Sequence, residues 1–329
     1  MTKPKVFISR RIGQEAFNAI AQHAEVTAKQ DEGPLDREEL FRNMADKDGV
    51  MLWLDKVDSA FLDAAPNLKV IAHRAIGFDN IDVEEVTKRG IRVSNAPSPA
   101  VIDCVADFTF ALMLASARRL VESVNLTFQG GWRIWDCVGS PVSGIDIHHR
   151  TLGTVGLGKI GATVAKRAKG FDMKVVYHDI VRSPYESEIG VEYVEDLPTL
   201  LGMSDIVSIH VPLTPETKHL IGAKELSYMK PTAILVNTAR GPVVDQKALY
   251  ETLKAKKIWG AALDVTEVEP IPPDDPLLTL PNVIIAPHIA GFTEATRTQM
   301  DLLAVENVVA ALQGNPMPSC INCHLLGKK

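Results

Sequence analysis

Three residue types that together suit the reduction of a carbonyl follow predicted β-strands in the second half of the chain. They are Arg240, a carboxylate at Glu267 or Glu269, and His288. An imidazole can donate a proton to a developing alkoxide near neutral pH, and a neighbouring carboxylate favours its protonated form and fixes its orientation. A guanidinium binds a carboxylate through two parallel hydrogen bonds. The set therefore fits hydride transfer between a nicotinamide and a 2-oxo or 2-hydroxy acid.

A glycine-rich segment predicts the matching cofactor site. Gly156, Gly158 and Gly161 form the pattern G-x-G-x-x-G between a predicted strand and a predicted helix. In dinucleotide-binding folds the first glycine permits a tight turn, the second lets the backbone approach the pyrophosphate, and the third lets the helix pack closely on the strand. The free N–H groups at the start of that helix face the phosphates. The pattern in this position indicates a Rossmann dinucleotide site.

Asp179 indicates which dinucleotide the site takes. It ends the next predicted strand, 18 residues after Gly161. An acidic side chain at this position accepts hydrogen bonds from the ribose hydroxyls and repels a 2′-phosphate, so we expect NAD as the cofactor. Arg182, three residues later, could reach a 2′-phosphate or could be a solvated loop charge, and the sequence leaves both readings open.

The elements that must position these residues are two series of β-branched runs that alternate with amphipathic helical patterns, which predicts βαβ units on parallel sheets. Strands are expected at 5–9, 25–28, 49–54, 68–73 and 91–95, and then at 151–155, 174–178, 206–211, 233–238, 260–265 and 283–286. A long helical pattern over 100–128 separates the two series. Parallel strands end at one edge of their sheet, where ligands bind, so Arg240, the carboxylate and His288 are expected to converge there. Taken singly, each of them could be an ordinary loop residue.

Composition narrows the class of protein. The chain has 329 residues, 46% of them hydrophobic and 23% charged, with a net charge of −6, which fits a soluble protein of two domains. The acidic balance argues against nucleic acid or an anionic membrane as a partner. Four cysteines are too few for a disulfide scaffold, the first residues lack the apolar stretch of a secretion signal, and the most apolar segment, 108–117, is too short to cross a bilayer. We therefore expect a cytoplasmic protein.

A resemblance to a known family is carried by seven segments along almost the entire chain. They are Gly77–Asp82, Leu152–Gly161, His210–Thr217, Met229–Pro231, Val236–Gly241, Gly260–Asp264 and Ala286–Ile289. These segments closely resemble the D-isomer-specific 2-hydroxyacid dehydrogenases, and within that family the chain is most similar to glyoxylate/hydroxypyruvate reductases. The resemblance implies an α/β fold of two doubly wound parallel-sheet domains.

The resemblance also implies how the chain is divided. A Rossmann NAD-binding domain at 100–288 is expected as an insertion into a flavodoxin-like substrate-binding domain formed by 1–99 and 289–329. A homodimer is expected, with Trp132 and Trp135 in the arm that helps to form the dimer in relatives.

By the same resemblance Arg240 binds the substrate, and Glu269 and His288 form the acid/base pair. Glu269 is preferred to Glu267 because the family's glutamate stands five residues after the strand aspartate, here Asp264. No metal is expected. The expected cofactor contacts are Gly156, Gly158, Lys159, Ile160, Gly161, Asp179, Val211, Pro212, Thr238, Ala239, Asp264 (to the nicotinamide carboxamide) and Ala290, and the further substrate contacts are Ile76, Gly77, Trp53 and Arg74.

The preferred substrate is less sharply indicated. A small 2-oxo acid of the glyoxylate/hydroxypyruvate type is expected. Arg74 stands where many of these reductases have an uncharged residue, as it does in some D-lactate dehydrogenases; it could contact an anionic substrate end or form a structural ion pair. The alternatives are a D-lactate, 3-phosphoglycerate or phosphite dehydrogenase on the same scaffold, or an NAD(H)-sensing protein that resembles the corepressors of this fold.

One motif is typical of a different kind of protein. Residues 320–324 match the C-x-x-C-H pattern of c-type haem attachment. The match is short, lies in a polar tail, and comes without a secretion signal or a haem-binding domain. We expect neither a haem nor a metal at this position.

Overall fold

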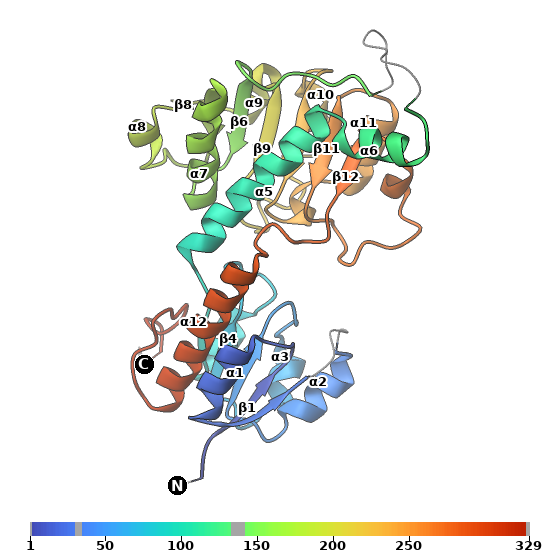
Figure 1. The fold of residues 1–329 in the computed structure, drawn as a ribbon. Helices are drawn as coiled ribbons and strands as arrows, with labels where there is room; N and C mark the ends of the chain where they lie inside the picture. Colours follow the sequence, from blue (N-terminus) through green and yellow to red (C-terminus); the bar gives the residue numbers. More distant parts are fainter. Residues whose placement is uncertain (1, 30–34, 133–141, 327–329) are drawn as a thin grey trace. The chain divides into compact units, whose positions relative to one another are not determined.

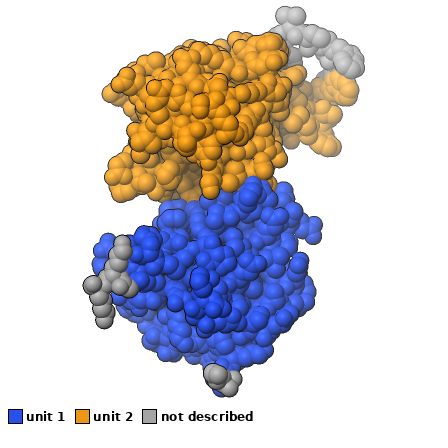
Figure 2. Space-filling view, turned by 90° about the vertical axis from the view of Figure 1, so that its left-hand side faces the viewer, with its two compact units in different colours: residues 1–101, 292–329 blue, residues 102–291 orange. Residues whose placement is uncertain are grey.

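The computed structural model describes residues 2–29, 35–132 and 142–326. The chain forms two compact units, shown in different colours in Figure 2. Unit 1 comprises residues 1–101 and 292–329, and unit 2 comprises residues 102–291. One unit is therefore discontinuous in sequence, with boundaries two and three residues from the expected 99/100 and 288/289.

Unit 1 contains a five-stranded parallel sheet with the strand order β2-β1-β3-β4-β5. This is the flavodoxin-like order, so the expected fold of this unit is confirmed. Its elements are β1 (Lys5–Ile8), α1 (Gln14–Ala21), β2 (Glu25–Ala28), α2 (Arg37–Met44), β3 (Gly49–Leu52), α3 (Ser59–Asp63), β4 (Val70–His73), α4 (Val83–Lys88), β5 (Arg92–Ser94) and, after the return of the chain, α12 (Glu294–Leu312).

The central strands of unit 1 are buried on both faces because apolar residues occupy successive positions. Along β1, Phe7 packs in one hydrophobic cluster, whereas Val6 and Ile8 pack in another. Successive strand residues point to opposite faces, so the two clusters lie on the two sides of the sheet. Helix α12 closes one of these sides and lies beside α1 and β4 (Figure 1).

The segment after α12 completes the edge of this sheet at β5. The fully buried side chain of Asn322 accepts a hydrogen bond from the Val93 N–H (2.9 Å) and donates to Ile91 O and Thr87 Oγ1 (2.9 Å each). The Ile321 N–H donates to Val93 O at 2.8 Å. Cys320 and Cys323, the cysteines of the haem-like motif, are joined to each other in a disulfide on either side of this asparagine.

Unit 2 contains a seven-stranded parallel sheet with the order β12-β11-β10-β9-β6-β7-β8. From β6 the chain adds β7 and β8 on one side, and then β9 to β12 on the other side of β6, as in the doubly wound Rossmann fold. The expected fold class is therefore confirmed for this unit as well. The elements are α5 (Pro99–Ala117), α6 (Leu120–Phe128), β6 (Thr151–Val155), α7 (Lys159–Ala168), β7 (Lys174–His178), α8 (Glu186–Ile189), β8 (Glu192–Tyr193), α9 (Leu197–Met203), β9 (Ile206–Ile209), α10 (Ala223–Tyr228), β10 (Ile234–Asn237), α11 (Gln246–Lys254), β11 (Gly260–Leu263) and β12 (Val283–Ile285), with short 3₁₀ turns at Lys169–Phe171, Gly241–Val243 and Pro276–Thr279.

The long helix expected over 100–128 is two helices. The chain leaves helical geometry at Arg119, whose φ is +49°, so that α5 ends at Ala117 and α6 begins at Leu120. Helix α5 is apolar and long enough to cross a membrane by length and composition. Half of that stretch is buried inside the protein, and Phe110, Met113 and Ala117 pack in the main core of unit 2, so α5 is accounted for as a core helix.

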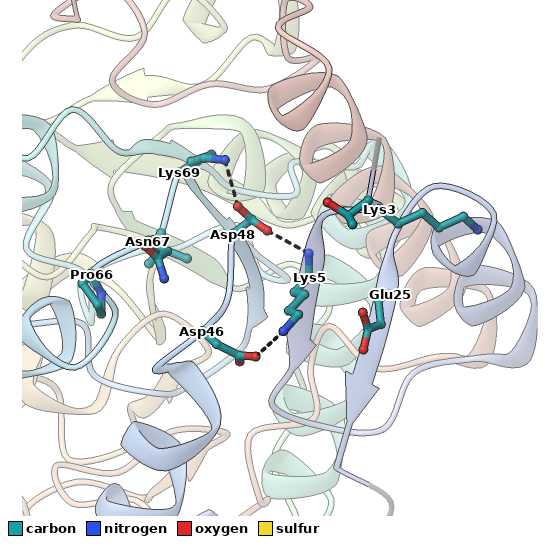
Figure 3. Close-up of a pocket in the computed structure, with 10 residues that line it drawn as sticks. Lys3, Lys5, Glu25, Asp46, Asp48, Pro66, Asn67 and Lys69 are labelled. Carbon is teal, nitrogen blue, oxygen red and sulfur yellow. Dashed lines mark hydrogen bonds and ion pairs between the residues drawn. The ribbon is translucent and has the colours of Figure 1, made fainter.

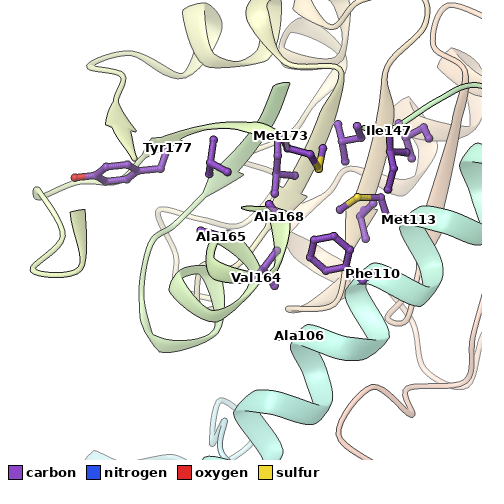
Figure 4. Packing of buried hydrophobic residues seen from close by; sticks show 14 of the residues in the cluster. Ala106, Phe110, Met113, Ile147, Val164, Ala165, Ala168, Met173 and Tyr177 are labelled. Carbon is purple, nitrogen blue, oxygen red and sulfur yellow. The ribbon is translucent and has the colours of Figure 1, made fainter. Parts of the chain in front are cut away.

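The main core of unit 2 lies between α5, α7 and one face of the sheet. Figure 4 shows Phe110 and Met113 of α5 close to Val164 and Ala168 of α7. Tyr177 of β7 lies at one end of this group, with its hydroxyl pointing away from the aliphatic side chains. A second cluster, which includes Leu200, Leu235 and Leu253, covers the opposite face of the sheet.

Candidate active site

The glycine-rich loop joins β6 to α7 at the carboxyl edge of the unit 2 sheet. Gly156 has a φ of +94°, and an added Cβ would lie 2.8 Å from His210 O, so this position accepts only glycine. An added Cβ at Gly161 would lie 2.4 Å from Gly156 O, which shows how closely α7 approaches the loop. Gly158 has open space where a side chain would lie and is the N-cap of α7, whose first residues are Lys159 and the half-buried Ile160. The loop thus leaves room at a helix N-terminus, as a pyrophosphate requires.

Asp179 directly follows β7 and lies against this loop. Its carboxylate accepts hydrogen bonds from the Leu157 N–H at 2.9 Å and from the Ile180 N–H at 2.8 Å. These contacts fix the carboxylate beside the glycine loop, where it can meet ribose hydroxyls. The residues of unit 2 therefore fit a dinucleotide of the NAD type.

The next two strands bring further expected cofactor contacts to the same edge. Val211 follows β9, and its side chain would be 3.0 Å from a Cβ at Gly156. Pro212 comes next, and its carbonyl accepts a hydrogen bond from Thr217 Oγ1 at 2.6 Å. Thr238 follows β10 and exchanges a hydrogen bond with Thr109 in the middle of α5 (2.9 Å), which anchors it to the core helix.

The buried side chain of Asn237 shapes the turn that carries Ala239 and Arg240. It accepts from the Ala239 N–H (3.0 Å) and donates to Arg240 O (2.9 Å). Asparagine commonly organises a turn through such side-chain contacts to the backbone. We gave Asn237 no role from sequence, although an asparagine at the end of a strand is the kind of signal that could have identified it.

Close packing at Gly241 brings this turn against the loop after β11. An added Cβ would lie 1.8 Å from Thr266 O, so any residue other than glycine would push the two loops apart. Thr266 is connected to the candidate acid/base pair because its N–H donates to Glu269 Oε1 at 3.1 Å. The structure thus places the Arg240 turn beside the loop that carries Glu269.

His288 and Glu269 are in direct contact. His288 Nδ1 lies 2.6 Å from Glu269 Oε2, and each side chain retains about 30% of its exposure. With Nδ1 directed at a carboxylate, the proton that the ring exchanges with a ligand is the one on Nε2. Among the described residues Nε2 has no hydrogen-bond partner, so it is available to a ligand.

Asp264 holds the turn on which His288 lies. His288 has a φ of +55°, a conformation that is unfavourable for a residue other than glycine. The turn is held by three hydrogen bonds of 2.8 Å: the His288 N–H donates to Asp264 O, and the Ile289 and Ala290 N–H groups donate to the two carboxylate oxygens. Burial raises the pKa of Asp264, while these two donors and the nearby His288 act in the opposite direction.

A second histidine, His210, lies next to the glycine loop. Its Nε2 lies 2.8 Å from Ser208 Oγ, and burial lowers the pKa of His210 to about 4. The side chain is therefore neutral near pH 7; the Cβ of His210 packs near Gly161, and its backbone carbonyl lies against Gly156.

In unit 1, Arg74 forms a structural ion pair, one of the two roles that the sequence allows for it. Its side chain is 6% exposed, and its Nε and Nη2 lie 2.7 Å and 2.6 Å from Asp301 Oδ1 of α12. It also donates to Arg10 O (3.5 Å) and Arg11 O (3.4 Å). These contacts favour the structural reading, and a contact with substrate remains an untested prediction.

The other expected substrate residues follow strands of unit 1. Trp53 comes directly after β3 and packs on Phe292 with ring centroids 4.9 Å apart, a contact that we did not anticipate. Ile76 and Gly77 lie in the loop after β4, where Asn95 Nδ2 donates to Ile76 O at 2.8 Å. Of the two arm tryptophans, Trp132 is exposed, and Trp135 lies outside the described residues.

A separate hollow of about 840 Å³ lies at the amino ends of the unit 1 strands, opposite the edge where ligands bind in such sheets. Figure 3 shows that Lys5 and Lys69 face carboxylates: Lys5 Nζ is 2.7 Å from Asp46, and Lys69 Nζ is 2.8 Å from Asp48. This hollow is lined by internal ion pairs and contains none of the residues expected to react. Across the described ranges there is also no group of three or more side chains suited to hold a metal ion.

The fold and the residues of unit 2 define a dinucleotide-dependent oxidoreductase, with a glycine loop, an acidic residue beside it, and an imidazole–carboxylate pair at the same sheet edge. Comparison with known proteins identifies the family within this class. The sequence model of the NAD-binding domain of D-isomer-specific 2-hydroxyacid dehydrogenases matches residues 110–290. The chain belongs to this family.

Relatives are similar over nearly their full lengths. The chain is 48% identical to a glyoxylate reductase of Korarchaeum cryptofilum, with 97% of this chain and 96% of the relative covered. It is 46% identical to a glyoxylate reductase of Thermofilum pendens, with 99% and 96% covered.

A solved structure of an NADPH-dependent glyoxylate/hydroxypyruvate reductase from Sinorhizobium meliloti, in complex with NADP and malonate, is 29% identical, covers 97% of both chains and has a TM-score of 0.86. The recognition of the family from sequence motifs is confirmed.

Proposed function

We propose that the protein reduces a small 2-oxo acid of the glyoxylate/hydroxypyruvate type to its D-2-hydroxy acid with NADH, and catalyses the reverse oxidation with NAD⁺. The proposal is supported by the names of the relatives and by the residues of unit 2. The observation that carries it is the 2.6 Å contact between His288 and Glu269, on loops at the same sheet edge as the glycine-rich turn and beside the turn that carries Arg240.

His288 acts as the acid/base residue in this proposal. When bound, the reduced nicotinamide supplies a hydride to C2 of the oxo acid, and the carbonyl oxygen then needs a proton. Nε2 of His288 donates that proton, because Nδ1 is directed at Glu269. In the oxidation the same nitrogen accepts the proton from the hydroxyl group.

Glu269 and Asp264 prepare His288 for this role. The Glu269 carboxylate orients the ring and stabilises the imidazolium form. Asp264 acts on the backbone, since its contacts with the Ile289 and Ala290 N–H groups maintain the turn. The contact of Asp264 with the nicotinamide carboxamide, which the family resemblance implies, is retained as part of the proposal.

Arg240 supplies the charge that a 2-oxo acid requires. Its guanidinium can bind the substrate carboxylate through two hydrogen bonds and polarise the neighbouring carbonyl. We assign the backbone of Ile76 and Gly77 to the same carboxylate, and Trp53 to the remainder of the substrate. The glycine loop, Lys159, Ile160, Val211, Pro212, Thr238, Ala239 and Ala290 are assigned to the cofactor.

A substrate panel tests the proposal. NADH oxidation is followed with glyoxylate, hydroxypyruvate, pyruvate and larger 2-oxo acids, and NAD⁺ reduction is followed with phosphite. We expect the highest kcat/KM with glyoxylate or hydroxypyruvate, and chiral chromatography should identify the D-isomer as the product from hydroxypyruvate. A preference for phosphite or pyruvate, or an L-product, would contradict the assignment.

We also propose that the protein is a homodimer. Helix α6 has no buried residue, and its apolar side chains at Leu120, Val121, Val124 and Phe128 are exposed, the last by 86%. Residues 120, 124 and 128 lie on one face of the helix, and a second copy of the chain would cover it. Light scattering after size exclusion should give twice the 35.9 kDa of the chain, and Val124→Glu with Phe128→Glu should give the monomer.

Finally, we propose a cytoplasmic location without a nucleic-acid or membrane partner. The support is the net charge of −6 and the core position of α5. Fractionation of the source cells should place the activity in the soluble fraction, and a membrane-bound activity would contradict the proposal.

A further inference from the structure

Arg182, the cation nearest in sequence to Asp179, is held by an internal carboxylate. Its Nε lies 3.0 Å from Glu186 Oε2, and its Nη2 lies 2.6 Å from Glu186 Oε1, so the ion pair is bidentate. The guanidinium also lies over the ring of Tyr193, with 5.0 Å between Cζ and the ring centroid. Two partners therefore fix the position of this side chain.

Glu186 is itself oriented by the core of unit 2. The hydroxyl of Tyr177 donates to Glu186 Oε2 at 2.5 Å, and it accepts a hydrogen bond from the Ser183 N–H at 3.1 Å. Tyr177 is the residue that ends the buried cluster in Figure 4, so its hydroxyl is presented by a rigid side chain. The Glu186 carboxylate that holds Arg182 is thus itself held in place by Tyr177.

The same network reaches the cofactor loop. Ser183 Oγ donates to Leu157 O at 2.6 Å, between Gly156 and Gly158. The Tyr193 hydroxyl donates to Asp179 O at 3.4 Å while its ring supports Arg182. A single tyrosine side chain therefore connects the Arg182 guanidinium to the backbone of Asp179, which lies three residues before it.

The charges of this network are complementary. Hydrogen bonds from Arg182 and Tyr177 lower the pKa of Glu186, and the hydrogen bond with Glu186 raises the pKa of Arg182. Exposed ion pairs are usually weak. Here bidentate geometry, an aromatic support and an oriented carboxylate act together, which favours the paired position over a free one.

We propose that Glu186 is a positioning residue that holds Arg182 away from the ribose 2′ position and thereby favours NAD(H) over NADP(H). The inference rests on the proposed function, and it adds a second device to the repulsion that Asp179 exerts on a 2′-phosphate. An arginine beside the ribose is what a 2′-phosphate requires, and this chain contains that arginine with its guanidinium already occupied. The fold itself accepts NADP, since the Sinorhizobium meliloti relative is NADPH-dependent.

Binding of two adenine nucleotides tests the proposal without turnover. 5′-AMP and 2′,5′-ADP differ only in the 2′-phosphate, and their Kd values are measured by calorimetry on the full-length protein. In Glu186→Gln we expect the affinity for 2′,5′-ADP relative to 5′-AMP to rise about three- to tenfold, because Arg182 is released toward the phosphate. The ratio of kcat/KM for NADPH to that for NADH should rise in parallel.

Two further variants separate this mechanism from simpler ones. The first variant tests for a simple charge effect, because loss of the negative charge of Glu186 would by itself favour a phosphate. If the gain instead requires Arg182, as proposed, Arg182→Ala combined with Glu186→Gln should abolish it. Glu85→Gln is the matched control, because Glu85 is as exposed as Glu186 and forms an i, i+4 ion pair with Arg89 in unit 1. It should leave both affinities and the turnover unchanged.

An unchanged 2′,5′-ADP to 5′-AMP ratio in Glu186→Gln would overturn the proposal, as would a gain that persists without Arg182. These results differ from a failure of the proposed function. That failure would appear in the substrate panel as a preference for phosphite or pyruvate, while the wild-type protein would still bind 5′-AMP and NADH.

Discussion

Unit 2 contains two histidine–glutamate pairs of nearly the same dimensions. His288 and Glu269 are 2.6 Å apart, and His219 and Glu267 are 2.8 Å apart. Both histidines have a φ of +55°, both pairs are about one-third exposed, and the two glutamates belong to one loop. Contact between an imidazole and a carboxylate therefore does not by itself identify the acid/base pair.

The surroundings of the two pairs differ. His288 follows β12, Asp264 holds its turn through hydrogen bonds from the His288, Ile289 and Ala290 N–H groups, and its Nδ1 faces the glutamate. His219 lies beyond β9 in a connecting loop, faces Glu267 through Nε2, and has its N–H bonded to Pro242 O. Glu267 is in turn bonded to the Gln246 N–H, which ties it to the start of α11. The His288–Glu269 pair lies at the sheet edge where ligands bind, whereas the His219–Glu267 pair connects two loops.

The largest difference is expected in turnover. His288→Ala should lower kcat about 10³-fold, because a general acid/base residue contributes roughly 10²- to 10⁴-fold. His219→Ala should change kcat less than about twofold, since its pair has no role in proton transfer. Steady-state rates with NADH and glyoxylate measure both, and titration with NADH checks that cofactor binding is kept. Equal losses in the two variants would remove the distinction between the pairs.

A third histidine sharpens the comparison because it has no carboxylate partner. Burial lowers the pKa of His210 to about 4 from an ordinary value of 6.5. Between these pH values the unfolded chain binds a proton that the folded protein does not, so stability falls as pH falls from 6.5 toward 4. This residue should account for on the order of 2 kcal/mol of the loss by pH 4.5.

Urea unfolding of the wild type and of His210→Gln between pH 7 and pH 4.5 measures this contribution. The slope should be flatter in the variant. Parallel slopes would show that His210 becomes protonated in the folded protein.

Substitution of the glutamates is expected to have a smaller effect on kcat. Glu269→Gln keeps the shape of the side chain but removes the charge that stabilises the imidazolium form of His288, so kcat should fall about 30-fold, or roughly 2 kcal/mol. Glu267→Gln should stay within about twofold of the wild type. The assay is the same as for the histidines, and a greater loss in Glu267→Gln would exchange the roles of the two pairs.

The smallest effect concerns stability. A double-mutant cycle of His219→Ala and Glu267→Ala should give a coupling free energy below about 1 kcal/mol, because partly exposed ion pairs contribute little. Urea unfolding at pH 6 measures it. A coupling above about 2 kcal/mol would show that the loop contact is a main support of unit 2.

Most of the sheet framework was predictable because the local pattern determines it. The strands at Glu25–Ala28, Thr151–Val155 and Lys174–His178 have the expected bounds, since each is an apolar or β-branched run that ends at a polar residue or a glycine. The two-residue strand β8 was missed, because it lies at a sheet edge and buries little apolar surface. The break at Arg119 was missed because no glycine or proline marks it.

The site was predictable where a residue follows a strand, and less so where a partner comes from elsewhere in the chain. Asp179 directly follows β7, and His288 lies three residues after the end of β12. The choice of Glu269 over Glu267 needed the family spacing, since both glutamates have a histidine partner. Arg74 meets Asp301 across 227 positions, and no local pattern indicates that pairing.

Asn322 has a consequence for how molecules of this protein meet one another. Strand β5 is the last strand of its sheet, and a bare last strand offers its N–H and C=O groups to any extended chain that approaches. Here Asn322 and Ile321 occupy the groups of Val93 and Ile91 that would otherwise attract a neighbouring molecule. The closing segment of the chain thus protects this edge of the sheet against edge-to-edge aggregation.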